Sequence, residues 1–222
     1  MLIRILFLLL LLALADVPTI AQTTDDAAMR TLLGGNKDLH HGGWGGVTTH
    51  YTRIMDQDAL LTGIRGGWII DHRLTIGLAG HGLVTQVPNK AYDDLQIANG
   101  EFLRRKSSLY MGYGGLLIEP IIAYRSPIHI SLPVIIGAGG VTYGNSRWAS
   151  YDNDQFDLDD HYDAQAFFVV EPGVELEFNV ISLVRVGVGA SYRYTTDLDL
   201  PATPKDALRG LNTGVSIKVG CF

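Results

Sequence analysis

The stretch AQAFFVVEPGVELEF, residues 164–178, decides the fold because its side chains alternate in character from one residue to the next. Such a period of two indicates a β-strand whose two faces meet different surroundings. One face is apolar and the opposite face carries acids and an amide. The apolar face holds Ala164, Ala166, Phe168, Val170, Pro172, Val174, Leu176 and Phe178, and the other holds Gln165, Glu171, Glu175 and Glu177.

The alternation extends in both directions from this stretch. In residues 183–195 a row of valines, alanine and tyrosines faces away from Arg185, Ser191 and Arg193. None of the runs has the 3.6-residue apolar period of an amphipathic helix, and they are rich in the Val, Ile, Tyr and Thr that strands prefer. We predict eight strands, at residues 43–55, 59–70, 74–86, 108–124, 128–143, 163–178, 183–195 and 208–222.

The connections between these strands are of two kinds. Residues 71–73, 125–127 and 179–182 are very short, whereas 87–107, 144–162 and 196–207 are long and polar. The first outer connection, 56–58, is the short exception. Short turns at one rim and long loops at the other are typical of outer-membrane barrels. The pattern predicts an all-β protein, an eight-stranded antiparallel up-and-down transmembrane β-barrel with both ends of the barrel chain on the short-turn side.

Alternation alone is also compatible with a soluble periplasmic barrel that encloses its apolar face and binds a small apolar ligand. We favour the membrane orientation, because the polar faces carry few charges and many glycines and the runs are long enough to cross a bilayer. Aromatic residues near strand ends are then expected in the interfacial girdles. They are Trp44, Trp68, Tyr110, Tyr124, Tyr143, Tyr192 and Tyr194.

Composition and the N-terminal sequence bound the class of protein. The 222 residues suit one domain, the net charge of −6 argues against a nucleic-acid partner, and a single cysteine excludes an intrachain disulfide framework. Residues 1–21 have the charged, apolar and small-residue regions of a cleaved secretory signal peptide. No apolar run of 18 or more follows, so a helical span is not expected. We predict a signal peptide (1–21), a flexible N-terminal segment (22–42) and a barrel (43–222).

Several segments add a family resemblance. GGWGGVTTHYTRI, LTGIRGGWIIDHRLTIGLAGHGLV, YMGYGGLLIEPII, VIIGAGGVTYG, FFVVEPGVELEFNV and VRVGVGASYRYT resemble small outer-membrane β-barrel proteins of Gram-negative bacteria, similar in plan to the OmpA/OmpX-type barrels. The resemblance covers residues 43–222 and implies contact with outer-membrane lipid and insertion by the outer-membrane assembly machinery, which reads a terminal aromatic residue. Phe222 is that residue here, although Val215, Ile217, Val219 and Cys221 alternate in the other phase. No catalytic residue and no cofactor is implied.

Charged side chains on the polar faces define a candidate site. We expect four acids and four bases to form an ion-pair network in the barrel lumen; the alternative is a narrow gated pore or ligand slot. Eight strands leave an interior just wide enough for side chains, and buried charges need partners. The eight residues are Arg65, Glu119, Glu171, Glu175, Glu177, Arg185, Arg193 and Lys218.

Two further groups of residues carry side chains suited to catalysis or to metal binding. His81 and His129, with Ser131 and a glutamate, suggest a lipid hydrolase as an alternative, although no nucleophile-elbow motif is present and no catalytic residue is assigned. An acidic stretch in the second long loop is expected to be a solvated loop, with calcium binding or bridging to lipid phosphates as the alternative; its pattern is not that of an EF-hand. It holds Asp152, Asp154, Asp157, Asp159, Asp160 and Asp163. The favoured function is a non-enzymatic outer-membrane scaffold that displays its long loops.

Overall fold

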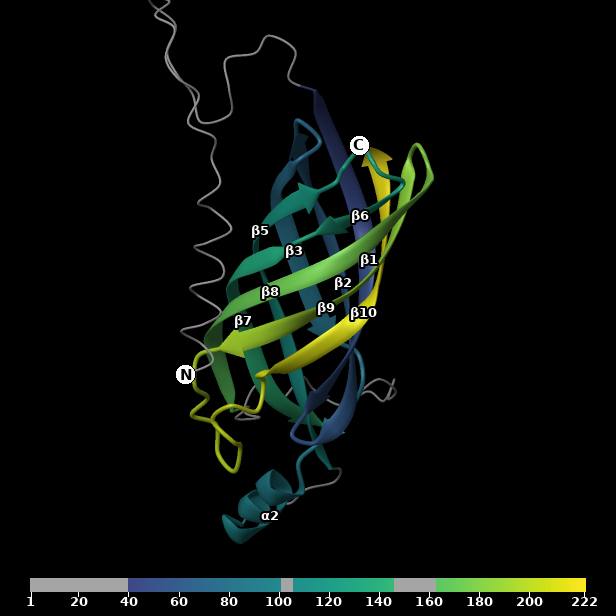
Figure 1. Cartoon of the computed structure of the whole chain (residues 1–222). Coiled ribbons are helices and arrows are strands. Elements are labelled where there is room, and N and C mark those ends of the chain that lie inside the picture. The colour runs from purple at the N-terminus through teal and green to yellow at the C-terminus, as the bar shows by residue number, and fades with distance from the viewer. Residues whose placement is uncertain (1–39, 101–105, 146–162) are drawn as a thin grey trace, which may run out of the picture. The chain divides into compact units, whose positions relative to one another are not determined.

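The computed structural model describes residues 40–100, 106–145 and 163–222. These residues form ten strands and one helix (Figure 1). In chain order the elements are β1 (His41–Ile54), β2 (Gln57–Ile70), β3 (Leu74–Leu83), β4 (Val87–Pro88), α2 (Lys90–Ala98), β5 (Ser107–Ile122), β6 (Ile128–Ser131), β7 (Val134–Asn145), β8 (Ala164–Ile181), β9 (Val184–Thr195) and β10 (Gly210–Cys221).

The strands close into an antiparallel ring. From β3 the order runs through β2, β1, β10, β9 and β8; β8 pairs with both β6 and β7, these pair with β5, and β5 returns to β3. Because β6 and β7 occupy one position between β5 and β8, and the two-residue β4 continues the position of β3 along β5, the barrel has eight strand positions. The prediction of an eight-stranded antiparallel barrel is confirmed. Among the described residues, every strand position of the ring therefore has a neighbour on both sides, as a bilayer requires.

Tight turns hold neighbouring strands in register. Met55 and Asp56 join β1 to β2, and both have positive φ (50° and 61°). A two-residue hairpin with positive φ at both positions matches the right-handed twist of the strands. Asp71 and His72 repeat this conformation between β2 and β3.

The structure differs from the sequence prediction in three places. Helix α2 lies within the connection 87–107, which was expected to be a loop; the Asn89 side chain caps it by accepting hydrogen bonds from the amides of Ala91 (3.1 Å) and Tyr92 (3.3 Å). The predicted strand 128–143 is interrupted before Val134, where Pro133 has no N–H to donate to the ladder. Finally, β1 begins at His41, inside the segment expected to be flexible, because His41 and Gly42 pair with β2.

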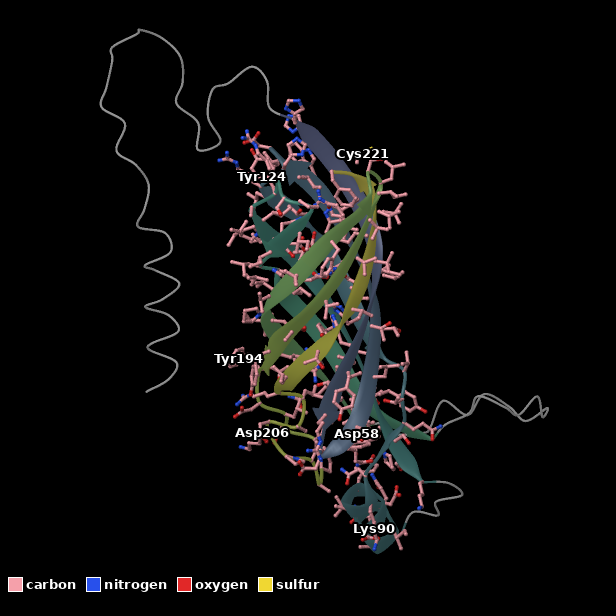
Figure 2. All side chains as sticks on the ribbon, turned by 45° about the vertical axis from the view of Figure 1, so that its right-hand side comes forward. Asp58, Lys90, Tyr124, Tyr194, Asp206 and Cys221 are labelled. Carbon is pink, nitrogen blue, oxygen red and sulfur yellow. The ribbon has the colours of Figure 1, made fainter. Side chains whose placement is uncertain are left out.

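Apolar side chains cover the outside of the barrel and charged ones lie inside it. Ile64 is 71% exposed, Leu78 70% and Phe168 72%, whereas Arg193 and Glu177 are fully buried. Figure 2 shows side chains projecting from the ribbon along its whole length, with Tyr124 and Cys221 at the short-turn end and Asp58, Lys90 and Asp206 at the long-loop end. The soluble-barrel alternative, in which the barrel encloses these apolar faces, therefore does not match the structure.

Two aromatic residues assigned to the girdles lie inside instead. Trp44 and Tyr143 are 6% and 1% exposed, because they share the phase of inward-facing neighbours on β1 and β7. Trp68, Tyr192 and Tyr194 do face outward. Among the described residues, no helix has the length and apolar character needed to span a bilayer.

Candidate functional site: the charged interior

The interior near the short turns holds three acids and three bases linked by ion pairs. They are Glu119, Glu175, Glu177, Arg65, Arg185 and Lys218. Lys218 on β10 is central: its Nζ lies 2.6 Å from Glu119 Oε1, also contacts Glu177 Oε1, and lies 3.8 Å from Glu175 Oε2. Arg65 Nη2 binds both oxygens of Glu175, at 2.6 and 2.5 Å, and its Nη1 is 3.8 Å from Glu119. This arrangement balances the buried charges, which is what makes their burial tolerable.

Neutral side chains complete this network. We call it the lower network and the short-turn half of the interior the lower half, although this end is at the top in Figures 1 and 2; the long-loop half is the upper half. Ser216 donates to Glu175, and Trp44 lies beside the two cations, with Lys218 Nζ 4.3 Å and Arg65 Cζ 5.7 Å from its ring. Gly187 on β9 is needed here, because a Cβ at this position would overlap Glu175 Oε1 and Ser216 Oγ. The indole Nε1 of Trp44 donates to Thr75 Oγ1 at 3.3 Å.

A second network lies nearer the long loops and has one acid and one base. Glu171 accepts hydrogen bonds from Tyr113 (2.5 Å), Ser191 (2.6 Å) and Asn212 (2.9 Å). Arg193 has no carboxylate within ion-pair distance among the described residues. It donates instead to the Leu208 carbonyl (2.6 Å) and to Asn212 Oδ1 (3.2 Å).

Asn212 thus links the two charged groups: it accepts a hydrogen bond from Arg193 and donates one to Glu171. The structure places all eight predicted lumen residues inside the barrel. It divides them into two groups rather than one, with six in the lower network and two in the upper.

The serine–histidine–glutamate arrangement of the hydrolase alternative is not formed. His129 Nε2 lies 2.9 Å from Glu177 Oε2, but the Ser131 hydroxyl donates to the other oxygen of Glu177 (2.7 Å) and not to the histidine. A nucleophilic serine needs the histidine as its base. All three side chains are buried, and His81 forms its hydrogen bond with Thr48 instead, at 3.1 Å.

The carboxylates of Glu119, Glu175 and Glu177 converge closely enough to suggest a metal site. The Lys218 ammonium occupies the centre of this group and contacts all three. The arrangement is thus that of a salt bridge, and these carboxylates are already neutralised.

The long-loop end of the barrel is filled by apolar side chains from strands and loops together. The cluster combines strand residues with Tyr92 of α2 and Leu198, Leu200 and Leu208 of the connection between β9 and β10. Asn89 ties these loops together: its Nδ2 donates to Tyr143 Oη (2.7 Å) and to the Ala202 carbonyl (2.9 Å). A continuous water channel through this end is not what such packing produces.

Sequence reasoning missed the neutral members of the interior, although part of the signal was present. Asn212 and Ser216 share the face of Lys218, so the period of β10 places them inside. Tyr113 lies on the same face of β5 as Glu119, six residues away, so the period of this strand also places it inside.

Of the acidic stretch, Asp152, Asp154, Asp157, Asp159 and Asp160 lie outside the described residues, as do the signal peptide and residues 22–39. Asp163 is described: its Oδ2 accepts a hydrogen bond from Tyr92 Oη at 2.8 Å. Burial, followed by this hydrogen bond, raises the pKa of Tyr92 to about 12.

Comparison with solved structures bears on the architecture. The structure of Neisserial surface protein A (NspA) is similar to this barrel, with a TM-score of 0.51 and 11% sequence identity. The match covers 82% of this chain and 99% of the NspA chain. The chain has the fold of a small eight-stranded outer-membrane β-barrel. The N-terminal barrel domain of Pseudomonas aeruginosa OprF also matches (80% of this chain, 96% of that domain, TM-score 0.42, 10% identity).

Ail of Yersinia pestis, solved in complex with the heparin analogue sucrose octasulfate, matches 81% of this chain and 97% of its own, with a TM-score of 0.46 and 8% identity. No protein-family model and no curated protein matches the sequence of this barrel. At these identities the likeness concerns the fold and not the activity.

Proposed function

We propose that this chain is a non-enzymatic outer-membrane β-barrel of a Gram-negative bacterium, exported by a cleaved signal peptide, that serves as a scaffold displaying its long loops at the cell surface. The observation that carries the proposal is the inverted pattern of exposure. Ile64, Leu78 and Phe168 point outward, whereas Glu119, Glu177 and Lys218 are enclosed. Exposing a large apolar side chain to water rather than lipid costs about 1.5–3 kcal/mol, so this surface suits a bilayer.

The filled interior supports a scaffold over a channel. The lower half contains a neutral ion-pair network and the upper half a packed apolar cluster. Outer-membrane lipid, and the assembly machinery during insertion, are the partners that we expect for such a barrel.

The described parts of two long connections contact each other at the loop end. Asn89 joins the connection 84–106 to that between β9 and β10 through the Ala202 carbonyl, and the Tyr92 and Tyr143 rings stack with centroids 4.0 Å apart. Lys90 and Lys205 are exposed on these loops. Both are accessible from outside the cell if the long loops are extracellular.

Fractionation and protease treatment test this proposal. We expect the mature chain in the outer-membrane fraction, a shift in gel mobility between unboiled and boiled samples, and fragments that end at Lys90 or Lys205, identified by mass spectrometry, when trypsin is added to intact cells. A chain with both lysines replaced by glutamine is the control for the cleavage sites. Release by carbonate, or cleavage only after the cells are opened, would contradict the proposal.

A further inference from the structure

Arg185 is the least satisfied cation of the interior. It lies at the start of β9, on the short-turn side, and is 6% exposed. Its ion pair is long, with Nη1 3.7 Å from Glu177 Oε2, and the Phe222 ring lies 3.8 Å from its Cζ. No other described residue hydrogen bonds to its guanidinium, and the buried Nε has no partner. A guanidinium has five N–H donors, and leaving them unpaired is costly.

This guanidinium lines an open cavity of about 570 Å³ at the short-turn rim. The cavity has polar and apolar walls. Tyr124 and Ser182 contribute hydroxyl groups, while Ile181 and Phe222 contribute apolar surface. Its volume falls in the range of small-molecule sites.

The rim of the cavity is positive. The guanidiniums of Arg73 and Arg125 lie 5.3 and 5.6 Å from the Tyr124 ring. Hydrogen bonding, from Arg73 first and Arg125 second, lowers the pKa of Tyr124. Two negative groups lie at this rim: Asp71, which is paired with Arg73 at 3.6 Å, and the α-carboxylate of Phe222, the last residue of the sequence. The three arginines Arg73, Arg125 and Arg185 outnumber them. An anion is thus attracted to this mouth.

The same rim has exposed apolar side chains beside the cavity. At the β8–β9 turn, Val180 is 61% exposed, Ile181 59% and Leu183 50%. Ile181 belongs both to this apolar surface and to the cavity wall. An anionic group bound at Arg185 therefore has hydrocarbon-binding surface directly next to it.

We propose that this cavity binds the phosphate group of a membrane phospholipid, with Arg185 as the principal cation and Val180, Ile181 and Leu183 against its acyl chains. Arginine pairs with phosphate oxygens through two parallel N–H groups. The Tyr124 and Ser182 hydroxyls supply further donors, and the neighbouring apolar surface distinguishes a lipid from a free phosphate. The assignment rests on the membrane insertion proposed above.

Native mass spectrometry of the full barrel, released from neutral detergent micelles, tests the site. The probes are dioleoylphosphatidylglycerol, dioleoylglycerol, which has the same chains without phosphate, and inorganic phosphate. We expect one retained phosphatidylglycerol and at least about ten-fold weaker retention of dioleoylglycerol, since a hydrogen bond to a charged group contributes about 1.5–3 kcal/mol. Equal retention of the two lipids would overturn the proposal, and binding of inorganic phosphate as tight as that of phosphatidylglycerol would overturn the assignment to a lipid.

Variants localise the effect. Arg185→Gln is expected to reduce phosphatidylglycerol retention about ten-fold or more, whereas Arg209→Gln, at the opposite rim, leaves it unchanged. Because Arg185→Gln also removes an ion pair with Glu177, the variant Ser182→Ala/Tyr124→Phe provides a second test that spares this pair, with an expected several-fold loss. Equal retention by all variants would refute the site. The mobility shift on heating shows separately whether each variant is inserted and folded, so loss of the site is distinguished from loss of the barrel.

Discussion

The two halves of the barrel interior are filled by different means. Next to the short turns, side chains from the strands alone form a charged network around Lys218. Next to the long loops, apolar side chains from strands, helix and loops pack together, with Leu208 fully buried among them. The lower half is therefore built by the sheet, and the upper half depends on how the loops fold back onto it. The predictions that follow test this difference, beginning with the largest effect.

Removing the central cation should be the most damaging change to the lower half. Lys218→Met leaves the Glu119 and Glu177 carboxylates buried without their shared partner. We expect a loss of about 3–5 kcal/mol in the free energy of unfolding, measured by urea titration in detergent micelles. In the double variant Lys218→Met/Glu119→Gln part of the loss is recovered, because one unpaired charge is gone. An unchanged midpoint for Lys218→Met would mean that these charges are not enclosed.

Truncating the apolar cluster tests the upper half. Leu208→Ala removes a fully buried side chain and should cost about 2–4 kcal/mol. Leu95→Ala on the exposed face of α2 is the matched control and should change stability by less than about 0.5 kcal/mol. If the two variants unfolded at the same urea concentration, the loops would not close over the barrel as described.

Uncoupling the loops should have a smaller effect, confined to the upper half. Asn89→Ala removes the cap of α2 and both bonds from Nδ2, at an expected cost of about 1–2 kcal/mol. We expect faster trypsin cleavage at Lys90 and Lys205 without a change in the lower network. Asn89→Ser retains a capping oxygen and should be intermediate. Identical cleavage rates in the three proteins would break the proposed link between the loops.

The smallest effect concerns pH. The folded protein raises the pKa of Tyr92 from the ordinary value of 10 to about 12, mainly by burial. Below pH 10 the phenol is protonated in both states and contributes no pH dependence. Between pH 10 and 12 the undocked state loses its proton first, so docking of α2 weakens as pH rises. The tyrosinate absorbance lost in Tyr92→Phe, taken as the difference between the two proteins, should titrate within this window; a difference that titrates near pH 10, or an unchanged profile in the variant, would contradict the assignment.

The sequence predicted the lower half far better than the upper. Alternation with a period of two tells which side of a strand a residue occupies, so Glu175, Arg185 and Lys218 were placed inside from the pattern alone. It does not say which side chains meet across the lumen, and the separation of Arg193 from Glu175 had no sequence signal. Leu198 and Leu208 lie in a connection without periodicity, so their burial depends on tertiary packing. Trp44 was misplaced because its aromatic character outweighed its phase.

The surface of the barrel wall that meets lipid can be identified directly with two tryptophans. Trp44 and Trp68 lie side by side on β1 and β2, since Gly43 pairs with Trp68, but the first faces inward and the second is 52% exposed. Single-tryptophan variants that retain one or the other, with phenylalanine in place of the remaining tryptophans, can be reconstituted into bilayers containing brominated acyl chains. We predict strong quenching of Trp68 fluorescence and little quenching of Trp44. Stronger quenching of Trp44, or equal quenching of both, would contradict the orientation on which the whole account is built.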